Sequence, residues 1–290
     1  MTTVQFRRTR IPHETAESFW ATAGPALEHI FDSPDIPVDI ETYSSVYSKC
    51  FNYQSSKAQR SSPPSQGFRN GLQIAVPAST VPMHRVDPED KHGMAGYRKV
   101  DDFFAERAKK IFDNVPDNSS SELVRYIITE FARFSAAVQT SSRMLVYMQR
   151  MFITQLIQEG CGWSTAGMPV VTVHNRSFLA EIREQKAERW GYKKDSDSNL
   201  GTWDEVESWA EAGSPLDCIV PIPSLAFRRF RIIFLEPLLS SDRLSVAVDE
   251  LLTGELAEDR ELILSLRNIF RKSGIDPENL VRVKLELQAQ

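Results

Sequence analysis

Residues 122–159, ELVRYIITEFARFSAAVQTSSRMLVYMQRMFITQLIQE, decide the fold. Their apolar side chains recur every three, four or seven residues, as they do on one face of a helix. The main stripe and the residues that adjoin it are Val138, Leu145, Met148, Phe152, Leu156, Ile153 and Ile157. Such a stripe is typical of a helix that packs against a core. Because glycines that follow a helix often end it, Gly160 and Gly162 predict an almost continuous helix from Glu122 to Glu159.

Helical periodicity extends outward from this stretch in both directions and predicts an all-α fold. It covers residues 15–31, 39–53 and 94–112 on the N-terminal side, and 224–239, 241–253 and 258–273 on the C-terminal side. Residues 54–92 are rich in Ser, Pro and Gln, which is typical of a flexible loop. Residues 161–223 break the rhythm and predict an irregular insertion with short helices of its own. Residues 1–14 are expected to form a flexible tail.

The composition is that of an ordinary soluble globular protein. Of 290 residues, 41% are hydrophobic and 25% are charged. The net charge is -5, whereas a nucleic-acid-binding protein usually carries a basic domain or a basic stripe. The longest apolar runs, such as Ile232–Leu235, are far shorter than the roughly 20 residues that span a membrane. The basic N-terminus has no apolar stretch after it, and the three cysteines are far apart, so we expect a reducing compartment, the cytoplasm or the nucleus.

Two segments of the sequence partly match ligand-binding sites. Residues 162–167 match the first half of a phosphate-binding loop, but Met168 and Pro169 stand where Lys and Ser or Thr are needed. His84, Asp87, Asp90 and His92 cluster in a predicted loop and are candidate metal ligands. A solvated polar loop explains the same four residues, and we favour that interpretation. We therefore expect no cofactor and no metal.

An enzyme built on the insertion is a further hypothesis. Cys161 lies between two glycines and is a candidate nucleophile, and His174 is a candidate base. Nucleophilic catalysis would require a thiol, a base and a third orienting group to converge in one pocket. No motif in the sequence indicates such a triad, so we expect that the chain is not an enzyme.

Two rows of aromatic and basic residues are the candidate binding features. Tyr43, Tyr47 and Phe51 recur at i, i+4 and i+8 on one predicted helix, and Arg143, Tyr147 and Arg150 form a second row. The second row lies largely away from the apolar stripe. Tyr and Arg on one helix face are enriched at binding hot spots. The alternative is that the tyrosines only cover helix-to-helix seams; the spacing leaves both interpretations open.

Several segments resemble one protein family in their order and spacing. They are WATAGPALEHIF (20–31), YSSVYSKCFNY (43–53), GMAGYRKVDDFF (93–104), VRYIITEFARF (124–134), YMQRMFI (147–153), FRIIFLEPL (230–238) and FRKSGID (270–276). Together they resemble the N-terminal region of cullins, the scaffold subunits of ubiquitin ligases. The strongest match is the pair of segments 124–134 and 147–153, where cullins carry a Tyr-Leu-Asn-Arg motif in place of Tyr147-Met-Gln-Arg150.

The resemblance implies a bundle of cullin repeats. Residues 15–160 would form one full repeat with the 54–92 loop inside it, and residues 224–290 the start of a second, with 161–223 inserted between them. It also implies a function, because the second and fifth helices of cullins bind an adaptor of BTB-type fold, which holds a substrate receptor. Carried over by position, the adaptor-binding residues would be Tyr43, Ser44, Tyr47, Tyr147 and Arg150.

The chain also departs from the family pattern. Ser44 stands where some cullins have a large apolar anchor, and Gln149 replaces the Asn of the motif. The C-terminal cullin region that holds the RING subunit is absent from these residues, so we expect no RING partner. The resemblance therefore implies a non-catalytic adaptor-binding scaffold module, or a cullin-like competitor that sequesters adaptors. The alternative is a helical scaffold or tethering protein unrelated to ubiquitin, whose aromatic rows serve packing only.

Overall fold

The computed structural model describes residues 14–58, 93–116, 120–165, 176–194, 199–253 and 257–275. In these residues every regular element is a helix, so the predicted all-α class is confirmed. The predicted tail before Glu14, most of the 54–92 loop, the candidate metal ligands at positions 84–92 and His174 lie outside the described residues. No helix in the described part of the chain combines the length and apolar character needed to cross a membrane.

The predicted helices lie close to their expected bounds. The N-terminal ones are α1 (Ala16–Asp32), α2 (Ile40–Ala58) and α3 (Met94–Asp113). The C-terminal ones are α9 (Ile222–Phe230), η5 (Arg231–Leu235), α10 (Glu236–Ser240), α11 (Arg243–Thr253) and α12 (Ala257–Lys272). The N-terminus of α1 is fixed by Thr15, whose hydroxyl accepts a hydrogen bond from the backbone N–H of Ser18 at 3.1 Å. Helix α2 continues to Ala58, five residues past its expected end.

The stretch 122–159 is helical but is not one straight helix. It is divided into α4 (Ser120–Met144), α5 (Val146–Met148), η2 (Gln149–Ile153), α6 (Thr154–Leu156) and η3 (Ile157–Cys161). The break at Leu145, with ψ of 15°, follows two serines. The hydroxyls of Ser141 and Ser142 donate to the carbonyls one turn earlier, each at 2.8 Å. Such back-bonding bends helices, which explains why the predicted continuous helix turns here.

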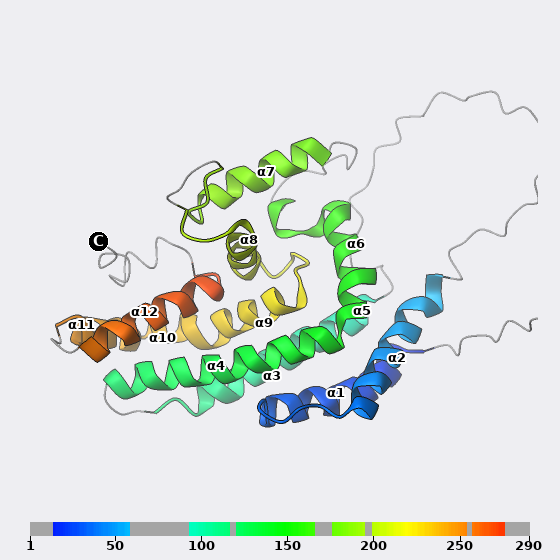
Figure 1. Cartoon of the computed structure of the whole chain (residues 1–290), viewed down its shortest axis with the longest axis horizontal. Coiled ribbons are helices and arrows are strands. Elements are labelled where there is room, and N and C mark those ends of the chain that lie inside the picture. Colours follow the sequence, from blue (N-terminus) through cyan, green and yellow to red (C-terminus); the bar gives the residue numbers. More distant parts are fainter. Residues whose placement is uncertain are drawn as a thin grey trace, which may run out of the picture.

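One hydrophobic core unites the helices. The predicted stripe is confirmed as core, because Val138, Leu145, Met148, Phe152 and Leu156 are all buried. Helix α4 runs the length of the bundle, with α11 and α12 at one end and α1 and α2 at the other (Figure 1). Helix α9 packs on α3 and α4 in the middle. Helix α2 therefore lies at one end of the molecule, against α1 and α5.

The region expected to be an insertion contains η4 (Trp163–Thr165), α7 (Arg176–Glu188) and α8 (Trp203–Ala212). Helix α8 begins with a capping box in which Thr202 and Glu205 satisfy each other's backbone N–H groups. Ala187, Val206 and Trp209 form a small cluster of their own, with Trp190, Tyr192 and Trp203 packed on it. Residues 218–220, by contrast, belong to the main core.

Candidate protein-interaction surface

Helix α2 carries two faces with different environments. Val46, Cys50 and Tyr53 are buried in the core at 0%, 0% and 2% exposure. A second face is formed by side chains at spacings of four, three and four residues: Ile40, Ser44, Tyr47 and Phe51. At 3.6 residues per turn these four positions lie within one narrow stripe. The second face points away from the core, because Ile40, Ser44 and Tyr47 are exposed and Phe51 is half-buried.

Aromatic contacts join this face to α5. The hydroxyl of Tyr43 donates to the backbone carbonyl of Arg143 at 2.9 Å, which ties α2 to the end of α4. The ring of Tyr147 meets the rings of Tyr47 and Phe51 edge-on, with centroid distances of 5.7 and 4.8 Å. Edge-to-face geometry at these distances is favourable beyond the area that it buries. The structure therefore brings together Tyr43, Tyr47 and Tyr147, which belong to two separate rows in the sequence.

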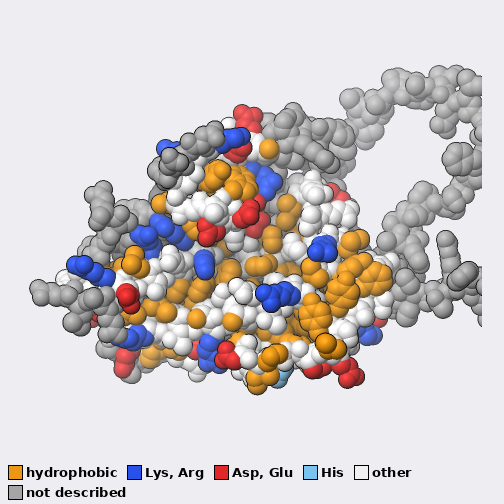
Figure 2. Space-filling view, viewed as in Figure 1, with side chains coloured by type: hydrophobic (Ala, Val, Ile, Leu, Met, Phe, Trp, Pro, Cys, Tyr) orange, Lys and Arg blue, Asp and Glu red, His pale blue; other side chains and the backbone are white. Residues whose placement is uncertain are grey.

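This end of the molecule exposes an unusual amount of apolar side chain. Four of the eight large hydrophobic residues that the described part of the chain exposes lie here: Ile36 (56%), Ile40 (87%), Tyr47 (38%) and Met151 (54%). Figure 2 shows hydrophobic side chains gathered over the end formed by α2 and α5. We call this surface the α2–α5 patch and define it as Ile36, Ile40, Tyr47, Phe51, Tyr147 and Met151. A contiguous exposed apolar patch marks an interaction site more often than scattered hydrophobic residues do.

The two remaining predicted residues lie beside the patch. Ser44 is exposed on the same stripe of α2, and its hydroxyl donates to the carbonyl of Glu41 at 3.1 Å. Arg150 follows Tyr147 by one turn and is exposed. Among the residues that the structure describes, no carboxylate forms an ion pair with Arg150. Its guanidinium is therefore available to an acceptor on a partner.

A π-helical turn holds this edge of the patch. In η2 the N–H of Thr154 bonds to the carbonyl of Gln149, and the Thr154 hydroxyl donates to the same oxygen at 2.8 Å. The side-chain oxygen of Gln149 accepts from the N–H of Ile222 at 3.0 Å, which ties η2 to the start of α9. Turns of this kind occur frequently at functional sites. Arg150 and Met151 thus project from a segment that is fixed to the core on its other side.

The degree of burial bears on the packing-only alternative. The rings of Tyr43 and Tyr147 are half-buried and that of Tyr47 is exposed, so none of the three is fully enclosed. The residues that sequence reasoning missed are Ile36, Ile40 and Met151. The sequence could have indicated the exposure of Ile40. Ile40, Tyr47 and Phe51 lie at i, i+7 and i+11, on one side of the helix and away from the buried residues of α2.

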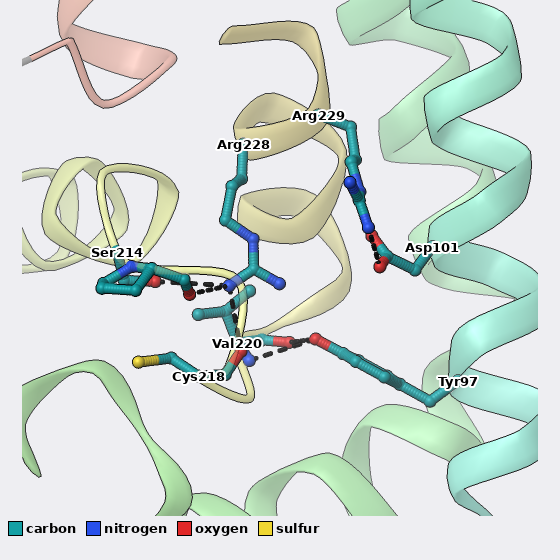
Figure 3. A network of polar contacts seen from close by, with 8 residues as sticks. Tyr97, Asp101, Ser214, Cys218, Val220, Arg228 and Arg229 are labelled. Atoms are coloured by element: carbon teal, nitrogen blue, oxygen red, sulfur yellow. Dashed lines mark hydrogen bonds and ion pairs between the residues drawn. The ribbon is translucent and has the colours of Figure 1, made fainter. Parts of the chain in front are cut away.

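A polar network lies inside the molecule (Figure 3). Arg228 of α9 is 1% exposed, and its Nη1 donates to the carbonyls of Pro215 and Cys218 at 2.8 and 2.9 Å. The hydroxyl of Tyr97, from α3, donates to the carbonyl of Val220 and accepts from its N–H, each at 3.2 Å. Arg229 forms a two-pronged ion pair with Asp101. The contacts of Arg228 and Tyr97 fasten the loop 213–221 between α8 and α9, and the Arg229–Asp101 pair joins α9 to α3.

Glu211 of α8 is the buried acid beside this network. It is 8% exposed and accepts a hydrogen bond from the Ser224 hydroxyl at 2.7 Å. Burial raises the pKa of its carboxyl from 4.5 to about 8, and the nearby Glu207 adds to the rise. Glu211 is therefore largely protonated at neutral pH.

The pH dependence of stability follows from this shift. Between pH 4.5 and about 8 the folded carboxyl keeps its proton while the unfolded one has lost it, so raising the pH favours unfolding. The stability that Glu211 contributes is complete below pH 4.5 and is lost as the pH rises through about 8. Wild type loses this stability between pH 4.5 and about 8, whereas Glu211→Gln has no carboxyl to lose it. We therefore expect the difference in free energy of unfolding, Glu211→Gln minus wild type, to increase by more than about 1 kcal/mol over this range. Urea unfolding at a series of pH values measures this, with the exposed Glu261→Gln as control. Parallel wild-type and Glu211→Gln curves would contradict it.

Of the two candidate catalytic residues, Cys161 is 4% exposed and His174 lies outside the described residues. Cys50, Cys161 and Cys218 are buried and form no disulfide with one another. Burial raises the pKa of the Cys50 thiol to about 12 and that of Cys218 to about 11, which keeps both in the unreactive thiol form. Within the described ranges, no group of three or more His, Cys, Asp or Glu residues is arranged to hold a metal ion.

No family model, no curated protein and no solved structure matches this chain. The resemblance to cullins rests on the motifs alone.

Proposed function

We propose that the chain is a non-catalytic interaction module that binds a folded protein partner through the α2–α5 patch. One observation carries this proposal: exposed apolar and aromatic side chains gather on α2 and η2 beside an arginine that forms no ion pair in the described chain. Tyr and Arg are the residue types enriched at binding hot spots. The patch rests on helices, which keep the anchors in place before the partner arrives and so reduce the entropic cost of binding.

The motif resemblance names the class of partner. In cullins the corresponding helices bind an adaptor of BTB-type fold, so we propose that such an adaptor, with its substrate receptor, is the partner of this chain. The chain would then act as a scaffold module in ubiquitin-dependent degradation, or sequester adaptors from intact cullins. Ser44 supplies no large side chain to the contact, so the apolar surface would come mainly from Ile40, Tyr47 and Met151.

A second candidate is a helical scaffold or tether unrelated to ubiquitin. The edge-on contacts of Tyr147 with Tyr47 and Phe51 favour it, because they account for these rings by packing between helices. The 87% exposure of Ile40 has no explanation in that case, since an isoleucine on the outer face of α2 adds nothing to packing.

The proposal predicts that removing two anchors strongly weakens partner binding. Tyr47→Ala combined with Arg150→Ala is expected to weaken adaptor binding by about 100-fold, because two hot-spot side chains contribute about 3 kcal/mol together. Affinity capture from the source cells with mass spectrometry identifies the adaptor. Titration of that purified BTB-fold adaptor onto wild type and variant gives the two dissociation constants.

The control is Leu264→Ala combined with Arg260→Ala, which removes one exposed apolar side chain and one exposed arginine from α12. The control should bind and unfold as wild type does. Tyr47→Ala also removes the ring contact with Tyr147, so we expect that variant to unfold a few degrees below wild type and to stay folded at the temperature of the titration. Full binding by the Tyr47→Ala, Arg150→Ala variant would eliminate the α2–α5 patch as the site. Failure of the wild type to bind any BTB-fold adaptor would eliminate the proposed partner.

A further inference from the structure

The chain that leads into the patch is strongly acidic. Residues 14–48 contain seven acidic residues and neither lysine nor arginine. Three of the seven form ion pairs with cations elsewhere: Glu14 with Lys49, Glu17 with Lys99, and Asp32 with Arg107. The other four are exposed and have no cation partner within the ranges that the structure describes: Glu28, Asp35, Asp39 and Glu41. Their charge therefore faces solvent at this end of the molecule.

Three of these acids alternate with exposed isoleucines where α1 turns into α2. The order is Asp35-Ile36, then Asp39-Ile40-Glu41. Ile36 is held by a turn, since its N–H donates to the carbonyl of Ser33 at 3.0 Å. Asp39 begins α2, where its carboxylate accepts from the N–H of Thr42 at 2.8 Å, and this hydrogen bond lowers the pKa of Asp39. We call these five residues the α1–α2 corner.

The geometry fixes how the corner relates to the rest of the patch. From Ile40 to Phe51 the stripe of α2 spans eleven residues, or about 16 Å at 1.5 Å per residue. The acidic corner lies at the N-terminal end of this stripe. Arg150 lies on η2, the segment after Tyr147, and Tyr147 contacts the Tyr47–Phe51 half of the stripe. The surface is thus apolar at Ile40, Tyr47 and Phe51, polar at Ser44 between them, acidic at the corner, and basic beside Tyr147.

We propose that the partner of the α2–α5 patch also covers the α1–α2 corner, with apolar side chains on Ile36 and Ile40 and basic side chains against Asp35, Asp39 and Glu41. This inference rests on the proposed function and adds the chemistry of the partner. The docking face of the partner is apolar and carries Lys or Arg at the border that meets the corner. Complementary charge of this kind speeds association and sets the orientation of the partner.

Two variants test the inference. Ile40→Ala removes an apolar anchor that makes little contact with its own chain, and we expect its dissociation constant for the purified BTB-fold adaptor to rise about tenfold. Asp35→Asn with Glu41→Gln removes two charges and leaves the cap at Asp39 in place. Binding of the wild type should weaken between about 50 mM and about 300 mM salt, because salt screens exposed charges. Binding of the Asp35→Asn, Glu41→Gln variant should weaken distinctly less over the same range.

The controls remove equivalent groups elsewhere. Leu264→Ala takes a similarly exposed aliphatic side chain from α12, and Glu106→Gln with Glu261→Gln removes two exposed charges from α3 and α12. Both controls should match wild type in affinity and in salt dependence. Thermal unfolding of each variant checks that the fold is unchanged, as the 87% exposure of Ile40 leads us to expect.

The outcomes separate this inference from the proposed function. If the wild type binds the adaptor and Ile40→Ala binds it equally well, the partner does not cover the corner. The inference then fails, while the proposed function stands on the remaining patch residues Tyr47, Phe51, Tyr147 and Met151. If the wild type binds no BTB-fold adaptor, the proposed function fails and the inference fails with it. If sedimentation shows a dimer of the wild type that Ile40→Ala abolishes, a second copy of this chain covers the corner and the inference is overturned.

Discussion

Replacing Arg228 by Met is expected to lower the free energy of unfolding by about 3 kcal/mol. The side chain is 1% exposed, and its Nη1 is the donor to the carbonyls of Pro215 and Cys218 and lies 3.4 Å from the hydroxyl of Ser214. Methionine fills much of the same space but donates no hydrogen bond. When a buried carbonyl loses its charged donor, the free energy of unfolding falls by the cost of desolvating that carbonyl. The hydrogen bond to Cys218 is buried and the one to Pro215 only partly so, and therefore the carbonyl of Cys218 accounts for most of the expected loss.

Urea unfolding followed by tryptophan fluorescence measures this change. Arg260→Met is the matched control, because Arg260 is exposed on α12 and its replacement should stay within about 0.5 kcal/mol of wild type. A loss below about 1 kcal/mol for Arg228→Met would mean that the loop 213–221 holds its position without the guanidinium.

Replacing Gly274 by Ala is expected to lower the free energy of unfolding by more than about 3 kcal/mol. Gly274 has φ of +73°, a conformation that residues with a Cβ rarely adopt, and it lies directly against the backbone between α8 and α9. An added Cβ would overlap the backbone of Ala212 and Gly213, including the Gly213 Cα at 2.6 Å. Because backbone atoms move less readily than side-chain tips, relief requires that the end of α12 separate from α8.

Gly160→Ala separates the two sources of this cost. Gly160 also has positive φ, at +87°, but a Cβ there would have nothing within 4 Å. It should therefore lose only the conformational term, about 1 kcal/mol. Thermal and urea unfolding of both variants give the comparison. Equal losses at the two positions would show that the close approach of α12 to α8 contributes little to stability.

Periodicity predicted the helices well because the recurrence of apolar residues every three or four positions is a local property. The bend at Leu145 was missed, although the run Thr140-Ser141-Ser142 before it carries the signal. Hydroxyls in a helix back-bond to carbonyls one turn earlier, and three in succession favour a bend. The loop fastened by Arg228 could not be predicted, because nothing in the sequence distinguishes a buried arginine from the exposed ones around it.

The candidate site was predicted in part for the same reasons. The rows of Tyr43, Tyr47 and Tyr147 have a helical spacing, so their placement together follows once α2 and α5 pack side by side. Ile40 and Met151 look like core residues in the sequence, since an apolar residue on a helix is usually buried. Only the packing of α1, α2 and α5 shows that the core is already complete without them.

Helix α4 has a consequence for how the chain can be divided. Its 25 residues extend over about 37 Å. Helices α11 and α12 pack at one end of α4, and α1 and α2 pack at the other (Figure 1). A fragment that stops before α11 would leave the buried face of α4 uncovered at its far end, although that end is remote from the α2–α5 patch. The binding end and the C-terminal end are therefore expected to melt together as one cooperative unit, and the smallest folding unit that carries the patch extends from α1 through α12.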